Sequence, residues 1–165
     1  MDRFLIQKII ILSLILGLAL GLLAPIPVVG MIMLFLILLL AAPIVILYLI
    51  MAGELDLTSP KDSIITGAII GFSANLTFAV SYSSLMVLLA KIFHYTPNFF
   101  LTAMITNSPI WLTGTFIIFL GVLCATTNSF TGFATYYIIN FIRDVYEKKH
   151  PQIQNTKDFT QENYK

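Results

Sequence analysis

The sequence predicts an all-α integral membrane protein with four transmembrane helices and a short C-terminal interfacial or re-entrant helix. Hydrophobic residues make up 58% of the 165 residues and charged residues only 10%, whereas an ordinary soluble domain has roughly 25% charged residues. Between Ser63 and Ile142 the only formal charge belongs to Lys91. A soluble domain of this length has no place to bury so large an apolar excess, so lipid is the predicted solvent.

The first two spans are predicted at about residues 4–23 and 29–51. Each supplies about the 20 mainly apolar residues that a helix needs to cross the hydrocarbon core. Lys8 lies near the start of the first span, where its long stem can reach back to the headgroups. Pro25 ends that helix. Pro43, near the centre of the second span, predicts a kink because proline removes a backbone hydrogen bond and crowds the preceding turn.

The third span is predicted at about residues 64–90. The sequence Thr58-Ser59-Pro60 before it is typical of a helix start, with a hydroxyl cap followed by proline. After this span, residues 99–106 fit a short helix at the outer membrane surface.

The fourth span is predicted at about residues 109–126. Apolar residues continue to Ile142, but a single helix over 109–142 would be about 50 Å long, which is too long for an untilted span. We therefore place a break in the polar stretch 126–129. The residues after it, about 130–147, are predicted to form a separate peripheral helix.

The basic residues are distributed unevenly over the predicted loops. Four spans leave Lys91 on one side of the membrane and place eight of the nine basic residues on the other: Arg3, Lys8, Lys61, Arg143, Lys148, Lys149, Lys157 and Lys165. Basic loops stay preferentially in the cytoplasm. The predicted location is therefore the cell membrane, with both termini cytoplasmic and residues 148–165 forming a disordered tail.

Two pairs of glycines with GxxxG spacing are the predicted helix-packing positions: Gly17 with Gly21, and Gly67 with Gly71. In a membrane such pairs let two helix backbones approach closely. The first and third spans then pack through these faces, either against each other or across an oligomer interface.

The third span is also the most polar one. A buried amide such as Asn75 usually finds a hydrogen-bond partner on a neighbouring helix. The alternative hypothesis is that Asn75, Thr77 and Tyr82 line a small polar path or solute pocket across the membrane.

No ionisable residue lies at the centre of any predicted span, although proton relays and ion-coupled pumps usually require one. His94 and His150 fall on opposite sides of the membrane and therefore cannot share a metal ion. Cys124 fits a small buried hydrophobic residue. No nucleotide-binding or hydrolase motif occurs. We therefore predict a non-enzymatic protein without catalytic, cofactor-binding or metal-binding residues.

These observations favour a protein that acts through helix packing, as an accessory or assembly subunit of a membrane complex. Its predicted partners are membrane lipid and either another membrane protein or a second copy of itself. A net charge of +1 gives no basic surface for nucleic acid. The alternative is a homo-oligomeric channel or facilitator for an uncharged small solute, and a holin-like lysis protein is a third hypothesis.

Overall fold

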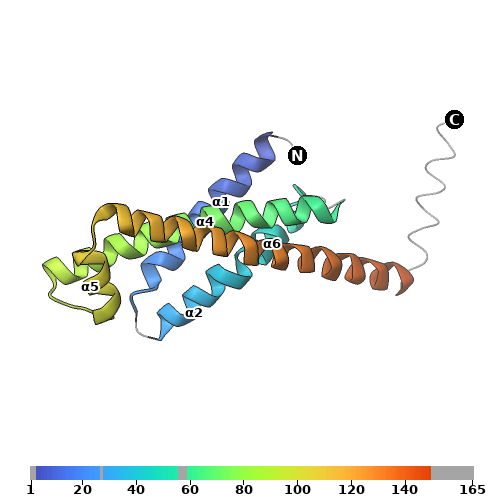
Figure 1. Cartoon of the computed structure of the whole chain (residues 1–165). Helices are drawn as coiled ribbons and strands as arrows, with labels where there is room; N and C mark the ends of the chain where they lie inside the picture. Colours follow the sequence, from blue (N-terminus) through green and yellow to red (C-terminus); the bar gives the residue numbers. More distant parts are fainter. Residues whose placement is uncertain (1–2, 27, 56–58, 150–165) are drawn as a thin grey trace.

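The computed structural model describes residues 3–26, 28–55 and 59–149, and every regular element in this part of the chain is a helix (Figure 1). Four helices are long and apolar enough to cross a membrane: Arg3–Leu23, Val29–Met51, Pro60–Ile92 and Ile110–Lys149. A short helix, α5 (Phe99–Asn107), joins the last two. The prediction of an all-helical, multi-pass membrane protein is confirmed at this level.

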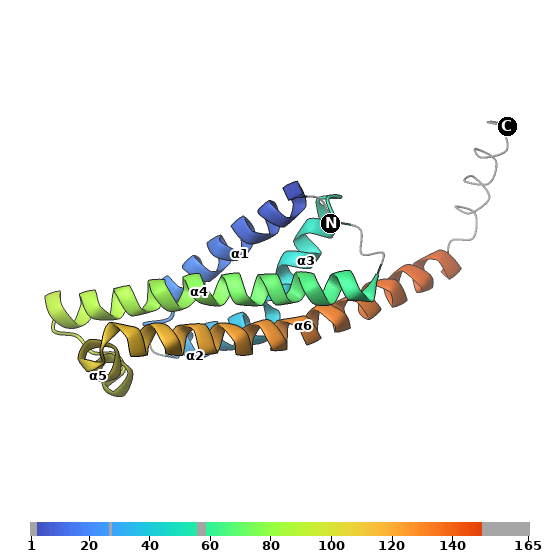
Figure 2. The same cartoon turned by 45° about the horizontal axis from the view of Figure 1, so that its top comes forward.

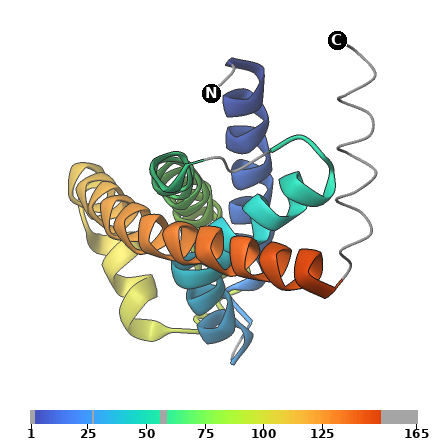
Figure 3. The ribbon, with the colours of Figure 1, turned by 90° about the vertical axis from the view of Figure 1, so that its right-hand side faces the viewer.

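The central helix of the bundle is α4 (Pro60–Ile92). The first helix, α1 (Arg3–Leu23), crosses α4, and α6 (Ile110–Lys149) runs alongside it (Figures 1 and 2). Figure 3 looks along α4 and shows that the second span lies beside both α1 and α6. The buried apolar core is formed largely by α1, the second span and α4.

The second span contains a π-helical turn. It consists of α2 (Val29–Phe35), η1 (Leu36–Leu40) and α3 (Ala41–Met51). The wide turn ends three residues before Pro43, which lacks an N–H and whose ring would collide with the carbonyl four residues earlier. Such π turns are a known cause of helix kinks. The irregularity expected at Pro43 therefore takes the form of η1.

The starts of α4 and α5 both have side-chain caps. The Ser59 hydroxyl accepts a hydrogen bond from the Lys61 N–H at 3.2 Å, and Pro60 occupies the first helical turn, where proline has no N–H to lose. The Asn98 carboxamide oxygen accepts from the Leu101 N–H at 3.1 Å at the start of α5. These caps fix where α4 and α5 begin.

The structure corrects the predicted break at residues 126–129, because α6 is one unbroken helix of 40 residues. Hydroxyls in this stretch donate to carbonyls in the preceding turn of α6, as Thr126 does to Leu123 at 2.8 Å and Ser129 does to Ala125 at 2.8 Å. Such bonds satisfy the polar side chains within the helix. The separate peripheral helix expected at 130–147 is therefore the second half of α6.

The length of α6 is about 60 Å, roughly twice the thickness of a hydrocarbon core. Its C-terminal part continues past the other helices (Figure 2). Lys148 and Lys149, which were expected in the disordered tail, form its last helical turn, where positive charge complements the helix dipole. The rest of the predicted tail, 150–165, lies outside the described residues.

Candidate functional site

The glycines of α1 lie directly against the backbone of α4. A Cβ atom on Gly17 would collide with the carbonyl of Ala74, and one on Gly21 would come within 2.7 Å of the carbonyl of Phe78. The two helices therefore touch backbone to backbone, as small residues allow in membranes.

The glycines of α4 face α6 instead of α1. A Cβ atom on Gly67 would collide with the Asn128 carbonyl, and one on Gly71 would collide with the Cys124 carbonyl. Gly132 completes the contact from the α6 side, since its Cβ would lie 2.8 Å from the Ser63 carbonyl. The two GxxxG pairs thus serve two different contacts on two sides of α4.

Asn128 of α6 inserts its side chain into the irregular turn of the second span. The side chain is fully buried. Its Oδ1 accepts from the Ala42 N–H at 2.8 Å, and its Nδ2 donates to the carbonyls of Ile37 at 3.1 Å and Leu38 at 3.0 Å. In a regular α-helix the Ala42 N–H and the Leu38 carbonyl would bond to each other. The amide of Asn128 therefore supplies hydrogen-bond partners for the Ala42 N–H and the Leu38 carbonyl, which the π turn prevents from bonding to each other.

Two hydroxyls close to Asn128 make further hydrogen bonds between helices. Thr127 Oγ1 donates to the Leu38 carbonyl at 2.9 Å, and Ser63 Oγ donates to the Gly132 carbonyl at 2.6 Å. We call this set of contacts the Asn128 junction; it comprises Ile37, Leu38, Ala42, Ser63, Gly67, Thr127, Asn128 and Gly132. It joins three of the four long helices through neutral polar groups, which makes it suited to hold helices together.

Asn75 lies further along the same contact between α4 and α6. It is 4% exposed, and its Oδ1 accepts from the Cys124 thiol at 3.3 Å. Its Nδ2 has no hydrogen-bond partner among the described residues. Asn75 therefore does contact another helix, but through one weak bond.

The other two residues of the predicted polar path make different contacts. Thr77 donates to the Ser73 carbonyl of its own helix at 3.1 Å, and it lies about 200° around α4 from Asn75. Tyr82 stacks on Phe78 with ring centroids 6.1 Å apart and packs against the apolar core. Asn75 and Thr77 thus point to opposite sides of α4 and do not line the same polar path.

The face of α6 that points away from the bundle carries large apolar side chains from Leu112 to Phe141. The buried residues of α6 (Gly121, Cys124, Asn128, Gly132 and Thr135) all lie on the other face. We call the outward set the α6 row; it consists of Leu112, Phe116, Phe119, Leu123, Phe130, Tyr137 and Phe141. These side chains are between 42% and 72% exposed, and they recur every three, four or seven residues, the spacing of one helix face.

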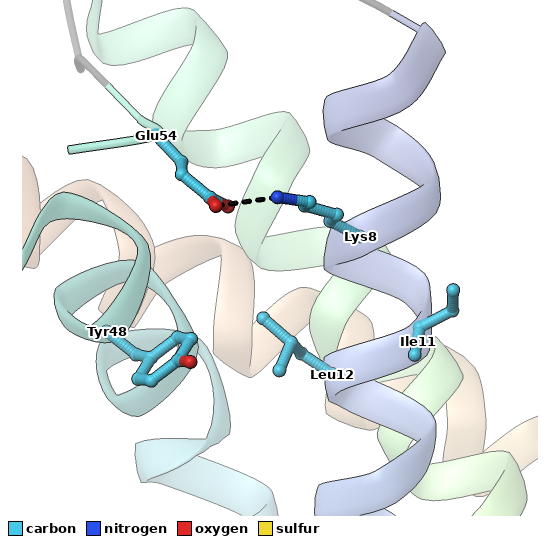
Figure 4. Close-up of a pocket in the computed structure, with 5 residues that line it drawn as sticks. All are labelled: Lys8, Ile11, Leu12, Tyr48 and Glu54. Carbon is cyan, nitrogen blue, oxygen red and sulfur yellow. Dashed lines mark hydrogen bonds and ion pairs between the residues drawn. The ribbon is translucent and has the colours of Figure 1, made fainter. Parts of the chain in front are cut away.

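A groove with a charged rim separates α1 from α3 (Figure 4). Lys8 of α1 forms an ion pair with Glu54, which follows α3, with Nζ and Oε1 2.6 Å apart. Lys8 Nζ also lies 4.9 Å from the centre of the Phe4 ring. Below this ion pair, Leu12 and Tyr48 point toward each other across the groove (Figure 4).

No group of three or more His, Cys, Asp or Glu residues in the described part of the chain is placed to hold a metal ion. Comparison of the sequence with protein-family models, curated proteins and solved structures finds no match. Function is therefore inferred from the geometry of this chain.

Sequence reasoning missed the role of Asn128 and the pairing of Lys8 with Glu54. Asn128 was assigned to a helix break because it lies in the polar stretch 126–129, and no local pattern pairs it with the turn before Pro43. Lys8 and Glu54 are separated by 45 residues without any charge. Two opposite charges that flank two consecutive apolar spans, with no charge between them, indicate an ion pair between those spans.

Proposed function

We propose that this chain is a non-enzymatic accessory or assembly subunit of a membrane complex and that it binds a partner membrane protein through the α6 row. The observation that carries the proposal is that this row runs along α6 from Leu112 to Phe141 and is left uncovered by the other helices of the bundle. Every residue from 141 to 149 is exposed. An apolar face that its own bundle leaves uncovered in a membrane is open both to lipid and to a helix of a second protein.

The geometry of the α6 row favours a helix as the partner. Intervals of three and four residues are those at which one helix packs against another at a shallow crossing angle. Four of the seven side chains, Phe116, Phe119, Phe130 and Phe141, are phenylalanines, which offer large contact areas with few rotatable bonds.

The interior of the bundle supports a packing role over a transport role. Helix backbones touch at Gly17, Gly67 and Gly71, and the side chains of Ser63, Thr127 and Asn128 bond to backbone groups of neighbouring helices. An interior of this kind is a packed core held by neutral hydrogen bonds. These contacts hold one face of α6 against α4 and the second span and leave the α6 row on the opposite face.

The distribution of charge supports a cell-membrane location with cytoplasmic termini. Lys8 of α1 lies beside Glu54 at the end of α3, so these helix ends share one side of the bundle with the start of α4, which carries Lys61 (Figure 2). Lys91 lies at the opposite end of α4. The positive-inside rule then assigns the first side to the cytoplasm.

The test is photo-crosslinking in the native membrane. A photoreactive residue replaces Tyr137, which is 54% exposed in the α6 row, or Ile142, which is 60% exposed and lies about 140° around α6 from Tyr137. We expect Tyr137 to capture one protein of defined mass and the matched position 142 to capture it weakly or not at all. Capture of a second copy of this chain would contradict the proposal and favour the homo-oligomeric channel or facilitator. Equal labelling from both positions would show that no partner covers the row.

A further inference from the structure

The groove between α1 and α3 has a dipolar rim and an apolar wall. Its volume is about 210 Å³, and it is lined by Lys8, Ile11, Leu12, Tyr48 and Glu54. Figure 4 shows Lys8 and Glu54 pointing toward each other at one end, with Leu12 and Tyr48 further along the groove. An amphiphile with a charged head and an apolar chain matches this order of groups.

The backbone fixes the position of Glu54. α3 ends at Met51, and Gly53 two residues later has a φ of 69°, a left-handed conformation that glycine adopts without strain. The Gly53 N–H donates to the Ile50 carbonyl at 3.0 Å, and the Glu54 N–H donates to the Leu49 carbonyl at 3.0 Å. These two bonds form the Schellman motif, a defined helix ending. The carboxylate is therefore held beside α1 by an ordered turn.

The ion pair stands at the level of the lipid headgroups. Lys8 precedes the long apolar part of α1 and Glu54 follows the long apolar part of α3, with no charged residue between them in sequence. Charged side chains at the ends of apolar spans lie where the hydrocarbon meets water. Their side chains are 37% and 36% exposed, so a lipid headgroup can reach both.

We propose that this groove binds one zwitterionic phospholipid whose headgroup carries a phosphate and a primary ammonium. The phosphate bonds to the Lys8 ammonium and the lipid ammonium bonds to the Glu54 carboxylate, while one acyl chain lies along Leu12 and Tyr48. Both are charge-assisted hydrogen bonds, which are stronger than neutral ones. An exposed ion pair is worth little, so separating Lys8 from Glu54 to admit the headgroup costs little.

Charge complementarity selects this class of lipid. Lys8 and Glu54 together are neutral, so the rim has no net attraction for an anionic headgroup, and a phosphate without an ammonium would leave the carboxylate facing negative charge. The apolar wall distinguishes a lipid from a free headgroup, because only the lipid has a chain to bury.

The proposal is tested by native mass spectrometry of the full chain in detergent. Phosphatidylethanolamine and phosphatidylglycerol with identical chains, and phosphoethanolamine without chains, are added in separate titrations. We expect one bound phosphatidylethanolamine at a concentration about tenfold lower than phosphatidylglycerol requires, a difference of about 1.4 kcal/mol. Phosphoethanolamine is expected not to bind. Equal binding of the two lipids, or binding of phosphoethanolamine as tight as that of the lipid, would overturn the proposal.

Variants separate the two charges. Glu54→Gln is expected to abolish the preference for phosphatidylethanolamine over phosphatidylglycerol. Lys8→Gln is expected to weaken the binding of both lipids. Lys61→Gln, an exposed cation at the same end of the bundle, is the control and should keep the tenfold preference. Circular dichroism checks that each variant has wild-type helix content. An unchanged preference in Glu54→Gln would exclude the site, and crosslinking from Tyr137 tests the partner surface separately.

Discussion

The contact between α4 and α6 contains two buried asparagines in different surroundings. Asn128 accepts from the Ala42 N–H, and its two Nδ2 hydrogens are shared among three carbonyls, those of Ile37 and Leu38 in the second span and that of Cys124 in its own helix. Asn75, one to two turns away along the same contact, accepts one bond from the Cys124 thiol and leaves its Nδ2 without a partner among the described residues.

The difference shows that an amide inside a membrane bundle gains most where a neighbouring backbone has open groups. The π turn before Pro43 leaves an N–H and carbonyls that lipid cannot satisfy, and Asn128 supplies their partners. Beside Asn75, α4 and α6 are regular helices whose backbone groups are already paired. The same side chain is therefore expected to be essential at one level and dispensable at the other.

Asn128→Leu should have the largest effect, a loss of about 3 kcal/mol in the free energy of unfolding. Leucine has a similar volume but leaves the Ala42 N–H and the Leu38 carbonyl with fewer partners, and each orphaned buried group costs roughly 1–3 kcal/mol. Reversible unfolding in lipid bicelles measures the change. Asn140→Leu, at a partly exposed position on the same helix, is the control and should change stability by less than about 0.5 kcal/mol. Equal losses of unfolding free energy in Asn128→Leu and Asn140→Leu would show that the bonds of Asn128 to the π turn add no stability of their own.

Gly67→Val should follow, with a loss of about 2 kcal/mol, because overpacking a close contact typically costs 1–3 kcal/mol. The added Cβ would meet the Asn128 backbone and push α4 away from α6. Gly114→Val is the matched control, since a Cβ at Gly114 would have no neighbour within 4 Å. The same unfolding measurement applies, and a stable Gly67→Val variant would show that α4 and α6 are not in backbone contact.

Ser63→Ala should cost about 0.6 kcal/mol, the average value of a hydrogen bond between membrane helices. It removes the bond from the Ser63 hydroxyl to the Gly132 carbonyl while the glycine contact remains. Ser84→Ala, at an exposed position of α4, is expected to have no measurable effect. A loss above about 1.7 kcal/mol, the largest value measured for such bonds, would mean that Ser63 supports more than this one bond.

Asn75→Leu should have the smallest effect, within about 0.5 kcal/mol of wild type. The substitution removes one weak bond to sulfur and also removes an unpaired buried donor, and these two changes oppose each other. A destabilisation as large as that of Asn128→Leu would show that the two amides contribute equally to stability and would contradict the proposed difference between them.

The sequence was sufficient to predict the four apolar spans, since hydropathy and length alone determine which segments can cross lipid. It also located the start of α4 at Ser59 and Pro60, because caps are local signals. The break in α6 was mispredicted because a continuous helix was judged too long for an untilted span and because Thr126 and Ser129 were judged only by polarity. Whether such residues end a helix depends on whether carbonyls of the preceding turn can accept their hydroxyls.

The contacts at the candidate sites depend on tertiary structure. The pairing of Asn128 with the turn before Pro43 joins segments about 90 positions apart, which no local pattern specifies. In the same way, Gly17 contacts Ala74 and Gly67 contacts Asn128, so the glycine spacing indicated close contacts without indicating their partners.

The central claim, that α6 presents its outward row to a partner protein, is tested most directly by native mass spectrometry of the protein extracted gently from its own membrane. We predict a defined complex that contains a second, different protein and that is lost in the Tyr137→Asp variant, whose added charge lies within the α6 row. A homo-oligomer of this chain alone, or a complex that the Tyr137→Asp variant leaves intact, would contradict the claim.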